Sequence, residues 1–345
     1  MNWYFLNPEL KLVNRLKKEF KSSEIIARVL ANRGIKSVTS SKEFFNPQLN
    51  QFYDPYKMHD MDIATDSVIN NIKLKKRILI YGDYDVDGTT GASMLYLALT
   101  ELGAKVIPYI PNREKEGYGL SKLGIDKAKK LGVNLIITCD CGINAFEPIK
   151  YANSLKIDVI ITDHHIPDET LPDALAVLNP KRTDCDYPFK DLCGGGVAFK
   201  LACALSEKMN QSADLMYKYL DLVTLGTCAD MVTIKDENRI IVKHGLKLLS
   251  NGSKPGIVSL LKLVGLENKS ISVGQLVFGV APKINAAGRL GDANRSVELL
   301  TTSDIRRAKS LADELLQENK KRQIIQQEVV DTAFNMIHAN IDLKN

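Results

Sequence analysis

The stretch RILIYGDYDVDGTTG, residues 77–91, is the most informative about the fold, because an apolar run of strand character leads directly into alternating aspartates. Asp83, Asp85 and Asp87 follow the run, and a helical pattern begins at Thr90. Ligand sites in open α/β sheets lie at the carboxyl ends of the strands. Carboxylate oxygens are the ligands that hard divalent cations prefer. We therefore expect a metal site at the end of this strand.

The aspartates admit two other interpretations. The pattern Asp-x-Asp-x-Asp-Gly resembles a calcium-binding loop, but the twelfth position is Met94 instead of Glu, and a strand precedes the motif. A loop of solvated acids is the second alternative, and the sequence around the motif leaves it open.

Four further short runs rich in Ile and Val follow downstream, at residues 105–110, 134–138, 158–162 and 174–178. Helical patterns fall between the runs, at residues 90–102, 120–131 and 146–155. Strands that alternate with helices indicate βαβ units on a parallel sheet whose two faces are both covered. We predict an α/β fold built on a doubly wound, mainly parallel sheet.

Acidic or imidazole side chains recur at the ends of three more apolar runs: Asp140 in TCDCG (138–142), His164 and His165 in TDHH (162–165), and Asp230 in LGTCAD (225–230). Two cations about 4 Å apart could share one bridging carboxylate and lower the pKa of a bound water. No Ser–His–Asp or Cys–His arrangement explains the same residues as well. The pattern therefore predicts a metal-dependent phosphoesterase.

Two segments supply groups that could hold a substrate. PKINAAGRL (282–290) contains Asn285 and Arg289, and an arginine fork suits the oxygens of a phosphate. NREKEGYG (112–119) contains Arg113 and Tyr118, which could clamp a phosphate and stack a base. Each segment taken alone is more often an ordinary turn.

The chain is expected to divide into a helical segment at 1–60, a catalytic α/β domain at 61–235, a helical extension at 236–300 and a long connector helix at 301–345. After Pro180 the patterns are mainly helical, and a glycine run at 194–196 opens a helical segment from Val197 to Met209. Residues 304–338 contain no Gly or Pro and carry apolar residues at helical spacing, which favours a long exposed helix.

Composition sets broad limits on location and partners. The 345 residues include 46 Lys and Arg against 41 Asp and Glu, a net charge of +5 that permits a polyanionic partner without requiring one. No run of 18 apolar residues occurs, and the N-terminus carries charges where a signal peptide needs an apolar stretch. The six cysteines are scattered and fit reduced thiols. We expect a cytoplasmic monomer with no membrane association.

These motifs resemble the DHH phosphoesterase family, whose name-giving triplet is Asp163-His164-His165. The resemblance runs in order through IARVLANRG (26–34), the aspartate motif, NREKEGYGL (112–120), TCDCGI (138–143), LNPKRTDCDYPFKDLCGGGVAFKL (178–201), LGTCADMV (225–232) and KINAAGRLGDA (283–293). The segment 178–201 separates the single-strand-specific 5′→3′ exonucleases of the family from its pyrophosphatases and cyclic-dinucleotide phosphodiesterases.

The resemblance implies residue roles and two divalent cations, Mn²⁺ or Mg²⁺. Asp83 and Asp85 would hold one cation, Asp87, His164 and Asp230 the other, and Asp140 would bridge them. His165 would assist the charge of the scissile phosphate, which Arg289 would contact with Asn285 near it. Arg113 and Tyr118 would lie along the strand near its 5′ end.

The resemblance also implies hydrolysis of single-stranded DNA from its 5′ end, release of 5′-mononucleotides, and a place in DNA repair and recombination. A single-strand-binding protein and a helicase are the implied protein partners. Members of this group continue past the long helix into a DHH-associated domain and an OB-fold, so we expect this sequence to be the N-terminal, catalytic part. Two alternatives stay open: a phosphodiesterase acting on short oligonucleotides or dinucleotides, and an inactive fragment that needs the missing domains.

Overall fold

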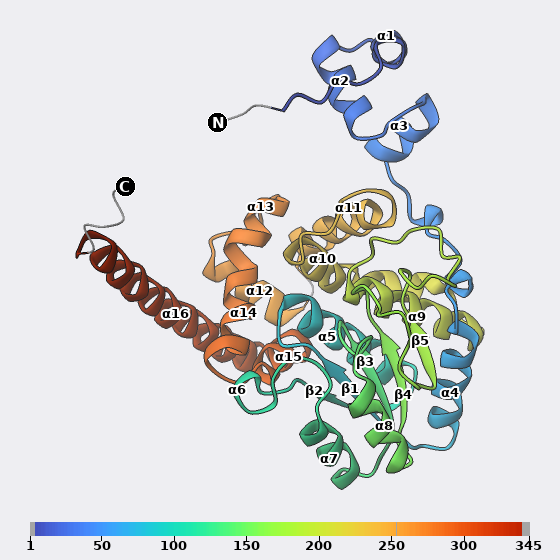
Figure 1. Ribbon diagram of the computed structural model, residues 1–345, viewed down its shortest axis with the longest axis vertical. Helices are drawn as coiled ribbons and strands as arrows, with labels where there is room; N and C mark the ends of the chain where they lie inside the picture. Colours follow the sequence, from blue (N-terminus) through green and yellow to red (C-terminus); the bar gives the residue numbers. More distant parts are fainter. Residues whose placement is uncertain (1–3, 253, 340–345) are drawn as a thin grey trace.

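The computed structural model describes residues 4–252 and 254–339, and in these residues five parallel strands form one sheet (Figure 1). The spatial order is β2-β1-β3-β4-β5, so the chain changes direction across the sheet between β1 and β3. The strands are β1 (Arg77–Gly82), β2 (Lys105–Tyr109), β3 (Val133–Cys139), β4 (Asp158–Thr162) and β5 (Ala176–Leu178). The prediction of a doubly wound, parallel α/β fold is confirmed.

Helices cover both faces of the sheet. One face is covered by α4 (Met61–Lys73), α5 (Val86–Glu101) and α9 (Gly194–Lys208), and the other by α7 (Lys122–Lys130) and α8 (Phe146–Ser154) (Figure 1). Alternate side chains of each strand point to opposite faces. Ile78 and Ile80 of β1 therefore enter the core beneath α5 and α9, whereas Leu79 and Tyr81 enter the core beneath α7 and α8.

The helices beyond the sheet extend the first of these two cores. They are α10 (Leu220–Ala229), α11 (Asp236–Asn251), α12 (Pro255–Leu263), α13 (Val273–Gln275), α14 (Ala281–Leu290), α15 (Asn294–Thr301) and α16 (Ile305–Ala339), with a π-helical turn at Leu276–Val280. Leu311 and Leu315 of α16 are buried in the core, and the helix then runs outward as a long exposed rod, as the sequence predicts (Figure 1). One continuous core joins residues on both sides of position 235.

The N-terminal helices stand apart from this body. They are α1 (Leu10–Glu19), α2 (Glu24–Asn32) and α3 (Val38–Phe45), and Figure 1 shows them displaced from the sheet and its helices. They enclose a small core of their own, formed by Val13, Leu16, Ala27, Leu30 and Ile35. We call residues 4–46 the N-terminal unit. It meets the body through α11.

Three boundaries differ from the sequence prediction. The first helix after β1 begins at Val86 instead of Thr90, because Asp85 acts as its N-cap and accepts the Gly88 N–H at 2.9 Å. Asp87 therefore lies in the first helical turn. In addition, α9 begins at Gly194, and the last strand covers only the final part of the expected run. No helix in the described ranges combines the length and apolar character that crossing a bilayer requires.

A buried ion pair connects α9, which covers the sheet, with α11 of the helices beyond it. Glu237 of α11 lies 3.0 Å from the Lys200 Nζ of α9, and both side chains are almost fully buried. Glu237 also accepts the Tyr187 hydroxyl at 2.7 Å and the Tyr53 N–H at 3.0 Å. Removing one partner of a buried pair leaves an uncompensated charge in the interior.

We expect Glu237→Ala to lower the free energy of unfolding by about 3–5 kcal/mol, measured by urea denaturation followed by circular dichroism. The matched control is Glu267→Ala, which breaks a pair with Lys262 whose atoms are 3.9 Å apart and whose side chains are largely exposed. The control should change stability by less than about 0.5 kcal/mol. Equal effects of the two substitutions would contradict the structural role of the buried pair.

Candidate metal centre

The sheet itself aligns the acids at the ends of its strands. The N–H groups of Asp83, Asp140 and Asp163 each donate to a carbonyl of the next strand, over 2.9 to 3.1 Å, so the ladder continues into the loops. Three carboxylates from distant parts of the chain thereby reach one edge. This edge includes the crevice between β1 and β3, where the strand order reverses, which is the position at which open α/β sheets bind ligands.

Six expected ligands come together at this edge in two groups. Within each group, one ligand atom per residue lies within 4.8 Å of the others. The groups are Asp83, Asp85 and Asp140, and Asp87, His164 and Asp230. Asp140 also forms a third group with His164 and His165, so it adjoins both. Most of these side chains are buried, with Asp85 and Asp230 partly exposed.

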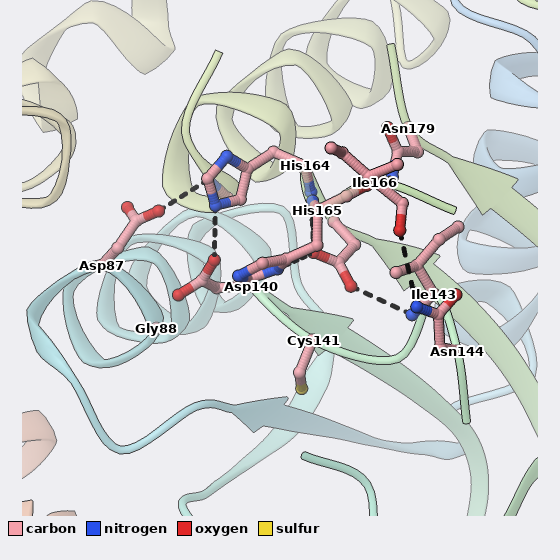
Figure 2. A network of polar contacts seen from close by, with 12 residues as sticks. Asp87, Gly88, Asp140, Cys141, Ile143, Asn144, His164, His165, Ile166 and Asn179 are labelled. Atoms are coloured by element: carbon pink, nitrogen blue, oxygen red, sulfur yellow. Dashed lines mark hydrogen bonds and ion pairs between the residues drawn. The ribbon is translucent and has the colours of Figure 1, made fainter. Parts of the chain in front are cut away.

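His164 lies at the centre of the cluster (Figure 2). Its Nε2 atom is 3.2 Å from Asp140 Oδ1, as Figure 2 shows. The same atom is 3.6 Å from Asp230 Oδ2. Neither ring nitrogen of His164 makes a hydrogen bond, and the same is true of the buried Asp83 Oδ1 and Asp140 Oδ1 atoms. Buried polar atoms are nearly always satisfied in folded proteins. Unsatisfied oxygen and imidazole nitrogen atoms facing one another therefore fit a divalent cation.

The pKa shifts of these residues also indicate a site for a cation. Burial, reinforced by neighbouring carboxylates, raises the pKa of Asp83 and of Asp87 to about 7 and that of Asp230 to about 6. It also raises the pKa of Asp140 well above its usual range. Burial lowers the pKa of His164 to about 4, so its imidazole is neutral and keeps a free electron pair at neutral pH. The ionised cluster is costly unless positive charge enters it.

Asp87 also anchors a helix. Its two carboxylate oxygens accept the N–H groups of Gly194 at 2.6 Å and Gly195 at 3.1 Å, which form the start of α9. The helix N-terminus carries partial positive charge that suits a carboxylate. A Cβ atom at position 194 would lie 2.5 Å from the Asp140 side chain, so only glycine permits this approach. The glycine run predicted to open a helix thus packs directly against the acids.

Asp163 orients the histidine pair. Its Oδ1 accepts the backbone N–H groups of His164 and His165 and lies 2.7 Å from His165 Nδ1, and its Oδ2 accepts the Ile143 N–H. The hydrogen bond that His165 donates to Asp163 raises the pKa of His165. The Asn179 amide further holds the carbonyl of His165, at 2.9 Å (Figure 2). The His165 side chain remains 44% exposed, at the mouth of the cluster.

An aromatic and cationic rim adjoins the cluster at Tyr84, between the first two aspartates of the motif. The Arg113 guanidinium lies 5.1 Å from the centre of the Tyr84 ring. The Tyr118 ring meets the Tyr84 ring edge-on, with 6.3 Å between the ring centres. Tyr118 also meets the His165 ring edge-on at 6.3 Å and is 58% exposed. A hollow of about 370 Å³ opens beside Tyr118 and His165.

The structure places the other two expected substrate residues on α14. A Cβ atom at Gly288 would lie 2.4 Å from the Tyr84 carbonyl, so α14 packs closely against the motif loop. Arg289 is exposed. Burial raises the pKa of the Tyr84 hydroxyl, and the positive charge of Arg289 partly opposes that rise. Asn285 lies four residues earlier, on the same face of the helix, and is half-buried.

Sequence reasoning assigned no role to several residues at this site. Asp163 and Tyr84 lay inside recognised motifs, yet motif position alone does not tell a ligand from a positioning group. Gly194 and Gly195 had a signal in their repetition, but their partner is distant in sequence. Lys181, whose positive charge acts on both His164 and Asp230, had no signal.

Comparisons with known proteins agree with this geometry. Residues 77–227 match the model of the DHH family, N-terminal domain. The chain is 40% identical over 337 residues to the single-stranded-DNA-specific exonuclease RecJ of Bacillus subtilis, covering 98% of this chain and 42% of that protein. It is 36% identical to RecJ of Escherichia coli over 315 residues, covering 88% of this chain and 54% of that protein. The chain thus spans about half the length of these relatives.

Solved structures give the same result. A crystal structure of exonuclease RecJ bound to manganese superimposes with a TM-score of 0.75 at 34% identity, covering 83% of this chain and 71% of that one. RecJ from Thermus thermophilus in complex with Mn²⁺ superimposes with a TM-score of 0.80 at 30% identity, covering 94% of this chain and 46% of that one. The chain therefore belongs to the DHH family and, within it, to the RecJ group.

Proposed function

We propose that this chain is the catalytic part of a metal-dependent phosphodiesterase with two divalent cations, Mn²⁺ or Mg²⁺. Asp83 and Asp85 would hold one cation, Asp87, His164 and Asp230 the other, and Asp140 both. The observation that carries the proposal is the convergence of six carboxylate and imidazole ligands from four separate segments, with buried and unsatisfied atoms on Asp83, Asp140 and His164. When bound, the cations would lower the pKa of a water molecule and neutralise phosphate charge.

The protein's own residues would position the scissile phosphate. Asp163 accepts the hydrogen bond from His165 Nδ1 and raises the pKa of the ring, which favours the protonated form. In that form the Nε2–H of His165 would donate to a phosphate oxygen at the mouth of the cluster. Arg289, exposed beside the rim, would grip the same phosphate, with Asn285 next to it. Both groups stabilise negative charge that grows as the phosphorus–oxygen bond breaks.

The proposed substrate is single-stranded DNA, degraded from its 5′ end to 5′-mononucleotides in DNA repair and recombination. The names of the relatives support the strand specificity. The rim supports it physically, because exposed aromatic rings next to arginine suit unpaired bases and their phosphates. Arg113 and Tyr118 would contact the strand near its 5′ end.

Several further assignments belong to the same proposal. A single-strand-binding protein and a helicase are the proposed partners, and the chain is proposed to be a cytoplasmic monomer. The division at residues 60, 235 and 300 is kept as a proposal for domain limits. The small separate core of the N-terminal unit supports its treatment as an independent element.

Asp140→Ala should abolish hydrolysis of a 5′-labelled single strand in the presence of Mn²⁺, because both cations lose a shared ligand. Released mononucleotide is measured by thin-layer chromatography. The matched control is Asp158→Ala, which removes an exposed carboxylate at the start of β4, on the opposite edge of the sheet. Near-normal turnover by Asp140→Ala would refute the assignment.

The same assay decides between the substrates. A long single strand should be degraded faster than a duplex or a dinucleotide of equal phosphate concentration. Faster hydrolysis of the dinucleotide would favour the short-substrate phosphodiesterase, which the partial coverage of the relatives keeps as a second candidate. Mononucleotides appearing first from the 3′ end would contradict the proposed polarity.

Thermal stability should depend on metal and pH together. The raised pKa values of Asp83, Asp87 and Asp230 mean that the metal-free protein is most stable when these groups are protonated. Its stability should fall as the pH rises through about 6 and 7. Mn²⁺ binds the ionised groups, so the increase in Tm over EDTA should be larger at pH 8 than at pH 5.5. An increase of equal size at both pH values would count against a metal bound by these carboxylates.

Asp163→Asn should reduce turnover by about 10–100-fold, the usual cost of losing a group that orients a site histidine. The amide keeps the size of the side chain but removes the charge and one acceptor that His165 needs. Steady-state kinetics on a single strand should show the loss in kcat, while Mn²⁺ still raises Tm because the six ligands remain. An unchanged kcat would show that Asp163 is not needed to position His165.

A further inference from the structure

One face of α11, remote from the rim, carries cations at a regular interval. Lys235 at the N-cap, Arg239, Lys243 and Lys247 follow one another every fourth residue, so they lie along one side of the helix. Each step advances about 6 Å along the helix axis. We call these four residues the α11 stripe. Figure 1 shows α11 on the side of the body that faces the N-terminal unit.

Two hollows lie along the α11 stripe. The first, of about 490 Å³, separates the N-terminal unit from α11, and Arg33, Lys235 and Arg239 line it together with two acids. The second, of about 900 Å³, is lined by Lys243, Lys247 and Lys269 and by serine and asparagine side chains. No acidic residue lines the second hollow within the described part of the chain. The stripe therefore borders open, mainly basic surface.

The cations of this surface lack acidic partners. Among the described residues, no carboxylate oxygen lies within 4.0 Å of the charged nitrogens of Arg33, Lys269 or the α11 stripe. Lys243 donates to Pro47 and Asn46, and Lys269 donates to Gly265, all of them neutral acceptors. Arg307, by contrast, is paired with an acid, because its guanidinium forms two short hydrogen bonds to the Glu298 carboxylate.

Like charges also face one another here. Arg239 packs on the Phe44 ring, with its guanidinium 3.7 Å from the ring centre, and donates to the Phe44 carbonyl. Burial lowers the pKa of Arg239, and the positive charge of Arg33 lowers it further. Two guanidinium groups directed at the same hollow, from the N-terminal unit and from the body, are relieved by an anion between them.

The distribution of charge along the chain strengthens the field at this place. Residues 1–46 contain nine of the 46 Lys and Arg residues but only four of the 41 Asp and Glu residues. The remainder of the chain is therefore balanced, and the whole net charge of +5 belongs to the N-terminal segment. That segment packs beside α11, so its charge adds to that of the stripe.

We propose that the α11 stripe, with Arg33 and Lys269, is a second contact surface for the sugar–phosphate backbone of a single strand, outside the metal centre. The inference rests on the proposed function, because it concerns the same substrate. A single row of cations, spaced by about one helical turn, can contact the phosphates of one strand. Lys235 follows Asp230 by a short loop, so a strand that leaves the centre could continue onto α11. Contacts to phosphates alone carry no base specificity.

Lys247→Glu with Lys269→Glu is the test variant, because both residues are exposed and, in the described part of the chain, neither forms an ion pair. The matched control is Lys105→Glu with Lys130→Glu, an equal change of charge at exposed lysines near the amino-terminal edge of the sheet. Binding of a fluorescent single strand is measured by anisotropy in EDTA, over a range of salt concentrations. Hydrolysis of bis(p-nitrophenyl) phosphate with Mn²⁺ is measured separately, as a readout of the metal centre.

The test variant should bind the strand more weakly at low salt, and the slope of log K against log salt should fall by about 0.7 for each lost phosphate contact. The control should keep the wild-type slope, and both variants should hydrolyse the small diester normally. Failure of the wild type to hydrolyse that diester would count against the proposed metal centre and not against the stripe.

Three results would overturn the inference: no binding of the strand by the wild type at low salt, equal loss in test and control variants, or an unchanged slope in the test variant. An equal loss of duplex binding would overturn the single-strand assignment, because one file of cations would then serve two backbones. Displacement of the strand by polyglutamate at equal charge would indicate an acidic protein partner instead.

Discussion

The cost of burying carboxylates close together governs the structure of this site. Asp83, Asp87 and Asp140 are almost fully withdrawn from water, and their pKa values are raised by burial and by one another. A protein core does not normally tolerate such a group of acids without a compensating charge. The helix N-terminus at Gly194 and Gly195 offsets part of the cost at Asp87. The unsatisfied atoms of Asp83, Asp140 and His164 show where compensation is incomplete, and there a divalent cation fits.

The sheet is what makes that concentration of charge possible. Parallel strands in register bring the carboxyl ends of β1, β3 and β4 to one edge, and continued backbone hydrogen bonds fix the residues immediately beyond them. Asp140 adopts a left-handed backbone conformation, with φ of 65°, directly after β3. Such a conformation is uncommon outside glycine and clusters at functional sites. Helices α9 and α10 then close over the acids, so the cluster is a property of the whole domain.

Surface electrostatics complement the buried centre. The rim around Tyr84 presents one arginine and one exposed aromatic ring next to His165, and α14 brings a second arginine to the same side. Within the described ranges, cations with no carboxylate oxygen within 4.0 Å also line α11 and the hollow beneath the N-terminal unit. A small set of acids, including Asp83, Asp87 and Asp140, is thus gathered inside the domain, while among the described residues the cations of the α11 stripe remain outside without acidic partners. That separation explains how a chain with only a mild net charge can still present basic surfaces to a polyanion.

The fold class and the candidate ligands could be predicted from the amino-acid sequence. Alternation of Ile- and Val-rich runs with helical patterns is a local signal, and acids after those runs mark the functional edge of a parallel sheet. The remaining features depend on tertiary contacts. The start of α5 at Val86 depends on capping by Asp85, and the role of Gly194 depends on Asp87, more than a hundred residues earlier. Contacts with residues distant in sequence likewise define the roles of Tyr84, Lys181 and the α11 stripe. Local patterns report the conformation of neighbours in sequence, whereas burial, pKa and unpaired charge depend on which distant segments fold against each other.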